Sequence, residues 1–169
     1  QLVAQLQTLG YAAVRIPDEE TLLANLKSEL EGFNATQFSP DEFKAILNQL
    51  SKGSIFDRAK ILRSTLSYPQ DDGTQAWIRL FDQENIAANR FQVTQQVSIQ
   101  GRNLNRYDVT LLMNGLPVVQ IELKRRGLEM KEAFKQISRY KRDSYGAGAG
   151  LFDFLQLFVI TNGVDTKYF

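Results

Sequence analysis

Three ionisable side chains stand inside two apolar segments that an Asn-Gly turn joins, within residues 106–126. Asp108 lies in the first segment, and Glu122 and Lys124 lie in the second. Because buried charges are costly without partners, these positions need a chemical reason. Mg²⁺ binds one or two carboxylates together with water and phosphate oxygens, and it needs no histidine. Asp108 and Glu122 therefore predict a Mg²⁺ site, where the metal would polarise a phosphorus, gather the attacking water and neutralise the leaving oxygen.

Lys124 is the third candidate for this chemistry. Residues two apart on a strand leave the same face, so Lys124 is expected beside Glu122. It could orient or deprotonate the attacking water, or stabilise the negative transition state. The sequence leaves the protonation state of Lys124 open. Burial lowers the pKa of a lysine, whereas neighbouring carboxylates raise it.

The face from which Asp108 projects depends on the turn at residues 114–115. A strict two-residue loop would put Asp108 and Glu122 on opposite faces of the hairpin. A three-residue loop with Gly115 in the left-handed conformation and a bulge would put both acids on one face, together with Gln120. We predict the odd-length loop, or a bulge in its place.

The Glu-x-Lys spacing by itself carries little information, because it occurs three times in the chain. The copies at residues 42–44 and 129–131 fall in helical patterns without an aspartate on a preceding strand. Only Glu122-Lys124 has the strand context. The alternative interpretation is an edge hairpin whose salt-bridged charges face water.

A helix is predicted over residues 128–144 from the spacing of its apolar residues. Gln136 and Tyr140 are four residues apart and share one side of this helix. Both are accessory candidates for the site, although Tyr140 is equally compatible with a core aromatic whose hydroxyl has a partner.

The charge of the chain is +1 overall, but residues 121–145 hold eight Lys or Arg against four Asp or Glu. A local basic stripe attracts an anionic polymer such as DNA. The candidates for contacts to backbone phosphates are Arg125, Arg126, Lys135 and Arg139.

The composition excludes several classes of chemistry. The chain has no cysteine and no histidine, which rules out disulfides, zinc sites of the Cys/His type and Ser-His or Cys-His nucleophiles. No apolar stretch approaches the roughly 20 residues that a membrane span needs, and the first residues lack the pattern of an export signal. We therefore expect a cytoplasmic protein without a membrane partner.

Hydrophobic periodicity predicts the elements that position these residues. Helical patterns cover residues 2–9, 17–34 and 39–50, and the last of these begins with Ser39, Pro40 and Glu42 in capping-box spacing. Strand patterns cover residues 76–81, 90–99, 106–113, 117–126 and 155–163.

This order of elements predicts an α/β or α+β fold, with a central mixed β-sheet flanked by helices and an N-terminal helical segment. We expect one domain over residues 1–169, mainly helical over 1–70 and forming the core over 76–169. The chain opens on Gln1 rather than on methionine, and we expect it to be a fragment of a larger subunit.

Three stretches together carry a family resemblance: NRYDVTLLMNGLPVVQIELKRRG, EAFKQISRY and LFDFLQLFVITNG. In this order they resemble the N-terminal nuclease domain of the restriction (motor) subunit of type I restriction-modification enzymes, within the Asp…Glu-x-Lys, or PD-(D/E)xK, nuclease superfamily. The resemblance implies a restriction-endonuclease-like fold and Mg²⁺-dependent cleavage of double-stranded DNA. It puts the family's metal-binding aspartate at Asp108, its Glu-x-Lys at Glu122 and Lys124, and its Gln-x-x-x-Tyr motif at Gln136 and Tyr140.

The resemblance also implies partners. The methyltransferase and specificity subunits of a restriction complex would select the target. ATP would be used only by the motor of the full-length subunit, whose G-x-x-x-x-G-K-[ST] phosphate loop does not occur in this chain. Two alternatives stay open: a non-catalytic DNA- or partner-binding module that keeps the nuclease fold, and a structure-specific repair nuclease of the same superfamily.

Overall fold

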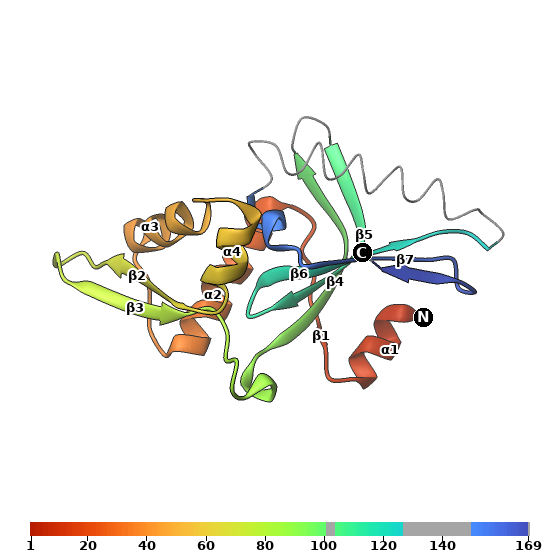
Figure 1. Ribbon diagram of the computed structural model, residues 1–169, viewed down its shortest axis with the longest axis horizontal. Coiled ribbons are helices and arrows are strands. Elements are labelled where there is room, and N and C mark those ends of the chain that lie inside the picture. Colours follow the sequence, from red (N-terminus) through yellow and green to blue (C-terminus); the bar gives the residue numbers. More distant parts are fainter. Residues whose placement is uncertain (101–103, 127–149, 169) are drawn as a thin grey trace.

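The computed structural model of the chain describes residues 1–100, 104–126 and 150–168. Their main element is a six-stranded mixed sheet with the strand order β1-β4-β5-β6-β7-β8, and a separate two-stranded sheet pairs β2 with β3 (Figure 1). The described helices are α1 (Leu2–Thr8), α2 (Glu19–Asn34), α3 (Pro40–Leu50) and α4 (Ile55–Ile61), with 3-10 turns η1 (Ile86–Ala88) and η2 (Gly150–Phe154). The described strands are β1 (Ala12–Ala13), β2 (Thr65–Pro69), β3 (Gln75–Arg79), β4 (Phe91–Gln100), β5 (Leu104–Met113), β6 (Leu116–Leu123), β7 (Leu157–Thr161) and β8 (Thr166–Tyr168).

This architecture confirms the predicted α/β class with a central mixed sheet and an N-terminal helical segment. The pairs β1/β4 and β6/β7 are parallel, and the other pairs of the main sheet are antiparallel. Among the described helices, none combines the length and the apolar character that a membrane span requires. The helix predicted over residues 128–144 lies outside the described residues.

Local sequence signals account for the helices of the first third. The predicted capping box starts α3, since the Ser39 hydroxyl accepts from the Glu42 backbone N–H and the Glu42 carboxylate accepts from the Ser39 backbone N–H. Helix α4 and strand β2 were not predicted. The predicted strand around residues 76–81 pairs with β2, next to α3, and does not join the main sheet.

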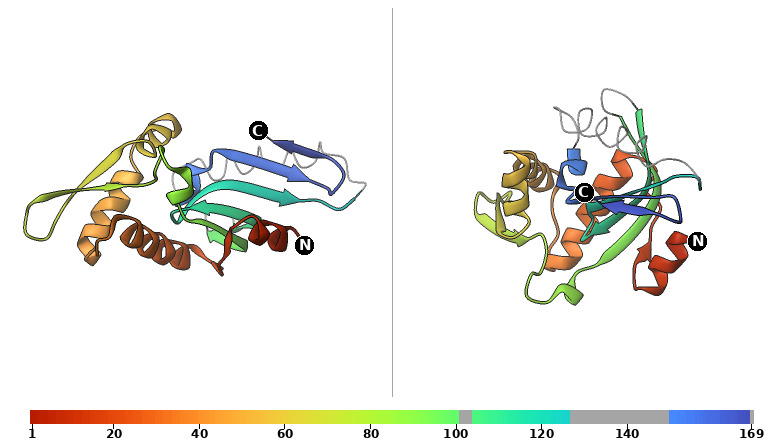
Figure 2. Two further views of the ribbon diagram at one scale, coloured as in Figure 1. Left: turned by 90° about the horizontal axis from the view of Figure 1, so that it is seen from below. Right: turned by 45° about the vertical axis from the view of Figure 1, so that its right-hand side comes forward.

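The two faces of the main sheet are covered by different elements (Figure 2). Helix α1 lies against one face, where its apolar side chains pack on a small cluster made of Val93, Val109, Leu111 and Ile121. The larger core lies on the other side and joins α2, through Leu22, Leu26 and Leu30, to Phe158 and Ile160 of β7. Strands β5 and β6, which carry the predicted acids, are therefore held between two apolar layers.

The turn between β5 and β6 is fixed by buried contacts. Asn114 and Gly115 have φ angles of 48° and 83°, as a two-residue type I′ turn requires. A Cβ atom on Gly115 would lie 2.7 Å from the Cα atom of Leu26 in α2, so glycine is required here by space as well as by conformation. The Asn114 side chain is fully buried, donates to the carbonyl of Leu80 and accepts from the backbone N–H of Arg90.

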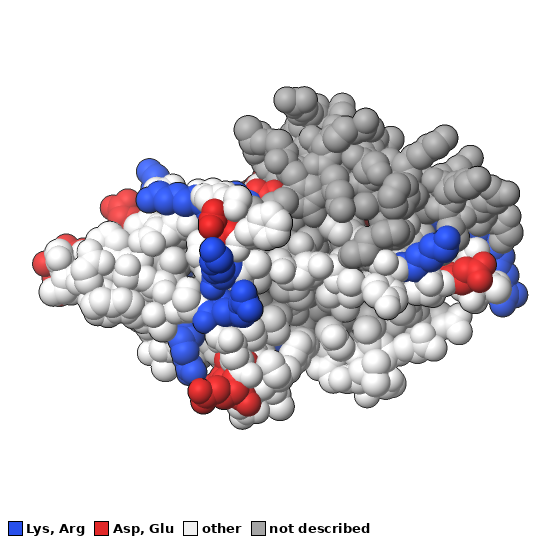
Figure 3. Space-filling view, in the orientation of Figure 1, with Lys and Arg blue, Asp and Glu red and all other residues white. Residues whose placement is uncertain are grey.

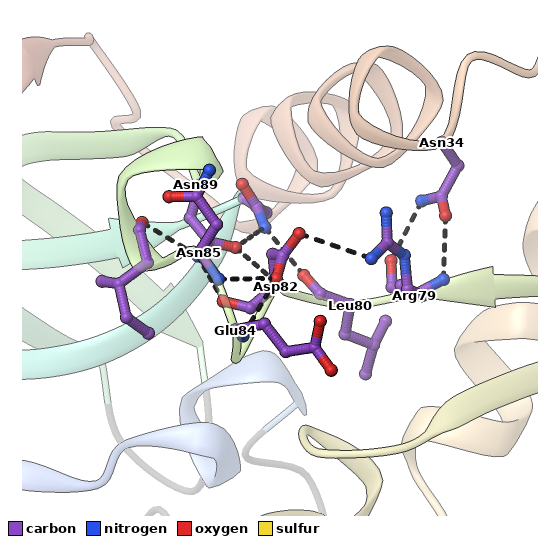
Figure 4. Close-up of polar contacts among 9 residues, drawn as sticks. Asn34, Arg79, Leu80, Asp82, Glu84, Asn85 and Asn89 are labelled. Carbon is purple, nitrogen blue, oxygen red and sulfur yellow. Dashed lines mark hydrogen bonds and ion pairs between the residues drawn. The ribbon is translucent and has the colours of Figure 1, made fainter.

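The segment that connects β3 to β4 ties the helical part to this turn (Figure 4). Asn34, at the end of α2, exchanges two hydrogen bonds with the backbone of Arg79. Asp82 accepts from two backbone N–H groups that follow it, and its own N–H donates to Asn89. Asn89 in turn accepts from the side chain of Asn114 at 2.9 Å. A chain of hydrogen bonds thus runs from α2 to the β5–β6 hairpin.

Candidate active site

A β-bulge in β6 sets the register that brings the two acids together. Leu112 pairs with Pro117, whereas Leu111 pairs with Val119, so Val118 is an extra residue on β6. The loop has two residues, so the predicted odd-length loop is wrong, and the alternative of a bulge is confirmed. Beyond the bulge, Val109 pairs with Ile121. Continuing this register by one residue sets Asp108 opposite Glu122. Without the extra residue, Asp108 would lie opposite Ile121 and Glu122 would project from the other face of the sheet.

A second irregularity lies at Asp108 itself. On β5, Val109 belongs to the cluster under α1, whereas Tyr107 belongs to the larger core and stacks on Phe152 with a ring-centroid distance of 4.3 Å. Opposite Asp108, between two regular pairs of β4 with β5, lies Gln96, whose φ angle is 61°. This left-handed residue interrupts the regular alternation of the strands. One end of β4 and the adjoining end of β5 extend away from the rest of the sheet (Figure 1).

The carboxylate of Asp108 reaches across to β6. Its Oδ2 atom accepts a hydrogen bond of 2.9 Å from the backbone N–H of Leu123. On the other side of β6, the backbone N–H of Lys124 donates to the carbonyl of Thr161 in β7 at 2.8 Å. β6 therefore remains hydrogen-bonded to β7 as far as Lys124. On its other side, the Asp108 carboxylate accepts from the N–H of Leu123 in place of a backbone carbonyl of β5.

Glu122 is a buried acid with an exposed fraction of 2%. Its burial and the negative charge of Asp108 raise the pKa of its carboxyl from 4.5 to about 7. The charge of Lys124 and hydrogen bonds from Gln120 and the Asp108 backbone act in the opposite direction. The Asp108 carboxylate accepts from the N–H of Leu123, the residue after Glu122, so the two acids are neighbours across the strands.

Lys124 lies where its spacing predicted. Its Nζ atom is 3.9 Å from Oε2 of Glu122, and its side chain is 22% exposed. The cation is therefore next to the buried carboxylate and still accessible from solvent. The two acids and the lysine are brought together, as the sequence predicted.

This set of residues fits a hard divalent cation. Both carboxylates offer oxygen atoms of the kind that such a cation binds. Burial and the charge of Asp108 oppose the ionisation of Glu122, and a bound cation would favour its ionised form. Within the described residues there is no cluster of three or more Asp, Glu, His or Cys side chains that could form an all-protein cage. Two carboxylates, with water and phosphate oxygens completing the shell, are typical of Mg²⁺ sites.

Of the predicted accessory and DNA-contact residues, the structure describes only Arg125 and Arg126. Arg125 and Arg126 lie just beyond β6, after Lys124, and are exposed. Gln136, Tyr140, Lys135 and Arg139 lie outside the described residues, so their positions stay predictions. On the face shown in Figure 3, the Lys and Arg side chains gather mainly over α4 and the adjoining part of β3, with Asp and Glu next to them.

Two residues of the site, Gln96 and Thr110, were missed by sequence reasoning. Gln96 follows another glutamine, and nothing in that pair indicates a left-handed φ angle. Thr110 is 1% exposed and bonds to Gln120. Its signal was a polar residue within the apolar part of β5, between Val109 and Leu111. The reasoning that singled out Asp108 could have paired it with Gln120.

Comparisons with known proteins give the family. The family model described as "Type I restriction enzyme R protein N terminus" matches residues 1–169. The chain is 41% identical to the type I restriction enzyme SauMSSORF170P endonuclease subunit of Staphylococcus aureus strain MSSA476, over 100% of this chain and 18% of that protein. It is 39% identical to the type I restriction enzyme EcoprrI endonuclease subunit of Escherichia coli, over 100% of this chain and 56% of that protein.

A third relative is the type I restriction enzyme SsaAORF53P endonuclease subunit of Staphylococcus saprophyticus, which is 41% identical over 99% of this chain and 18% of its own length. The chain thus spans between about a fifth and about a half of the length of these relatives. The family match over the whole chain agrees with the resemblance found in the site hairpin. The chain therefore belongs to the family of N-terminal regions of type I restriction enzyme R proteins.

Proposed function

We propose that this chain is the Mg²⁺-dependent endonuclease part of a type I restriction enzyme and hydrolyses phosphodiester bonds of double-stranded DNA. The observation that carries this proposal is the meeting of Asp108, Glu122 and Lys124 at the end of β6. That meeting requires a bulge at Val118, and a hairpin built only for stability has no need of it. The names of the relatives supply the substrate class.

Each residue of the trio has a distinct role in this proposal. Asp108 and Glu122 would hold the Mg²⁺ ion through their carboxylate oxygens. When bound, the ion supplies Lewis-acid chemistry, polarising the phosphate and lowering the pKa of bound water. Lys124 faces the same place and would orient the attacking water or stabilise the negative charge that develops on the phosphate oxygens. The Lys124 side chain is 22% exposed, so its ammonium group would be accessible to a backbone phosphate.

The wider context of the reaction belongs to the same proposal. ATP-driven translocation would be performed by a motor in the rest of the subunit. Methyltransferase and specificity subunits would select the DNA. Exposed Arg125 and Arg126, just beyond the site strand, would contact backbone phosphates without reading bases.

Substitutions in the intact subunit, assembled with its partner subunits, test this function. Asp108→Ala, Glu122→Ala and Lys124→Ala should each reduce cleavage of plasmid DNA by at least about 100-fold and leave ATP hydrolysis unchanged. Lys44→Ala is the matched control, because Lys44 has the same spacing to a glutamate but is exposed on α3.

The same experiment separates the alternatives. A non-catalytic module would lose neither activity, or both together through misassembly. A repair nuclease would cut branched DNA in preference to linear DNA and without ATP. Either outcome would reject the proposed function.

A further inference from the structure

A buried pair of polar residues lies next to the candidate metal ligands. Gln120 has an exposed fraction of 0% and Thr110 one of 1%, and the two are cross-strand partners on β6 and β5. The hydroxyl of Thr110 donates to Oε1 of Gln120 at 2.8 Å. The Gln120 Nε2 atom lies 3.3 Å from Oε1 of Glu122 and 3.3 Å from the carbonyl of Ile121.

The orientation of the Gln120 amide is determined by these contacts. A carboxylate and a carbonyl both accept hydrogen bonds, so the side that faces Glu122 must be the NH₂ group. The remaining amide oxygen then accepts from the hydroxyl of Thr110, which as a hydroxyl can serve either side of an amide. Glu122 and the Ile121 carbonyl therefore select the amide orientation, because a reversed amide would oppose oxygen to oxygen. Thr110 holds the amide in place from its other end.

This contact distinguishes the two oxygens of the Glu122 carboxylate. Oε1 accepts from Gln120, while Oε2 is the atom that lies 3.9 Å from Lys124. Together with the hydrogen bond from the Asp108 backbone, this contact restricts the rotation of the carboxylate, and Oε2 is left on the side of the lysine. A hydrogen bond to the ionised form also favours the state in which a carboxylate binds metal.

We propose that Gln120 is a positioning residue that holds the Glu122 carboxylate for metal binding, and that Thr110 anchors the Gln120 amide. This inference rests on the proposed function, since it assigns a supporting pair to the same Mg²⁺ site. Partners that orient metal ligands typically change metal affinity about 10- to 100-fold when they are removed. The competing explanation is a buried polar pair that contributes only to folding.

The chain contains a matched control for this distinction. Gln92 on β4 is also buried, and its Nε2 atom donates to Oε1 of a buried glutamate, Glu29, at 3.1 Å. Its amide is likewise anchored by a second polar side chain, Asn25. Glu29, however, pairs with Arg90. Replacing either glutamine by methionine removes the same type of hydrogen bond, but only Gln120 contacts a candidate metal ligand.

The test uses Fe²⁺ as a probe in the intact subunit. With ascorbate and peroxide, Fe²⁺ that occupies the site generates hydroxyl radicals, which cut the polypeptide near residues 108 and 122. Fragment yield against Fe²⁺ concentration gives an apparent affinity, and competition by Mg²⁺ identifies a shared site.

We expect Gln120→Met to raise the half-saturating Fe²⁺ concentration at this site by about 10-fold or more, and Thr110→Val to raise it in the same direction. Thr110→Ser keeps the hydroxyl and should restore the wild-type value. Gln92→Met should leave the value unchanged, even where it lowers the melting temperature by as much as Gln120→Met does.

Three results are decisive. Wild-type cutting near residues 108 and 122, with an unchanged half-saturation in Gln120→Met, would overturn the inference and leave the proposed function intact. Absence of that cutting in the wild-type subunit would reject the proposed metal site, and the positioning role with it. Should Gln120→Met fail to fold, the comparison of Thr110→Val with Thr110→Ser decides: equal half-saturation in these two variants contradicts the role assigned to the pair.

Discussion

The substitution Glu122→Gln should stabilise the metal-free fold while removing its proposed chemistry. The pKa of Glu122 rises from 4.5 to about 7 in the folded chain, through burial first and the charge of Asp108 second. One pKa unit corresponds to about 1.4 kcal/mol. Ionised Glu122 therefore lowers the free energy of unfolding by about 3 kcal/mol once the pH exceeds 7.

The sign of this effect follows from proton binding. Because the folded state holds the proton more tightly than the unfolded state, wild-type stability falls as the pH rises from 4.5 to about 7 and then levels off. Glutamine is neutral throughout. The free energy of unfolding of the variant should therefore match that of the wild type near pH 4 and exceed it by about 3 kcal/mol at pH 8. The loss of the ion pair between Lys124 and residue 122, whose charged atoms are 3.9 Å apart, reduces this gain.

Urea unfolding of the chain in EDTA, at several pH values between 4 and 8, measures this difference. Exposed Glu84→Gln is the control for the same chemical change on the surface. Adding Mg²⁺ at pH 8 should stabilise the wild type, because ligand binding favours the folded state, and should not stabilise Glu122→Gln. A stability difference that does not vary with pH, or a variant less stable than the wild type at pH 8, would refute the reasoning.

Three further predictions concern the scaffold of the site. Deleting Val118 removes the bulge and should turn Glu122 to the opposite face, so that Fe²⁺-dependent cutting at the site disappears in the intact subunit; retained cutting would show that the register is set elsewhere. Asn114→Ala removes buried hydrogen bonds at a position with a φ angle of 48° and should lower the free energy of unfolding by about 3 kcal/mol, measured by urea; a loss below about 1 kcal/mol would contradict the anchoring of the turn. Arg58→Met leaves the carboxylate of Asp153 without its ion partner in a largely buried setting and should cost about 2 to 3 kcal/mol, most of which Arg58→Met combined with Asp153→Leu should recover; an equal loss in the double variant would mean that packing, and not charge, explains the effect.

Local signals in the sequence were sufficient wherever neighbouring residues decide the structure. The capping box of Ser39 and Glu42 starts α3, and the Asn-Gly pair forms the turn of the site hairpin. The Glu-x-Lys spacing places Lys124 beside Glu122, since alternation along one strand is a property of the backbone alone. Helix α4 and strand β2 escaped prediction because their stabilisation comes from contacts with distant segments, such as that between Arg58 and Asp153.

The sequence by itself determined which residue types were present and excluded every histidine- or cysteine-based chemistry. It could name Asp108 and Glu122 as candidate metal ligands, but it could not decide on which faces of the sheet they lie. That decision belongs to the tertiary structure, because one extra residue at Val118 and one left-handed residue at Gln96 change which side chains meet. Such irregularities persist only where packing on both faces of the sheet holds them, and that packing joins residues far apart in the chain.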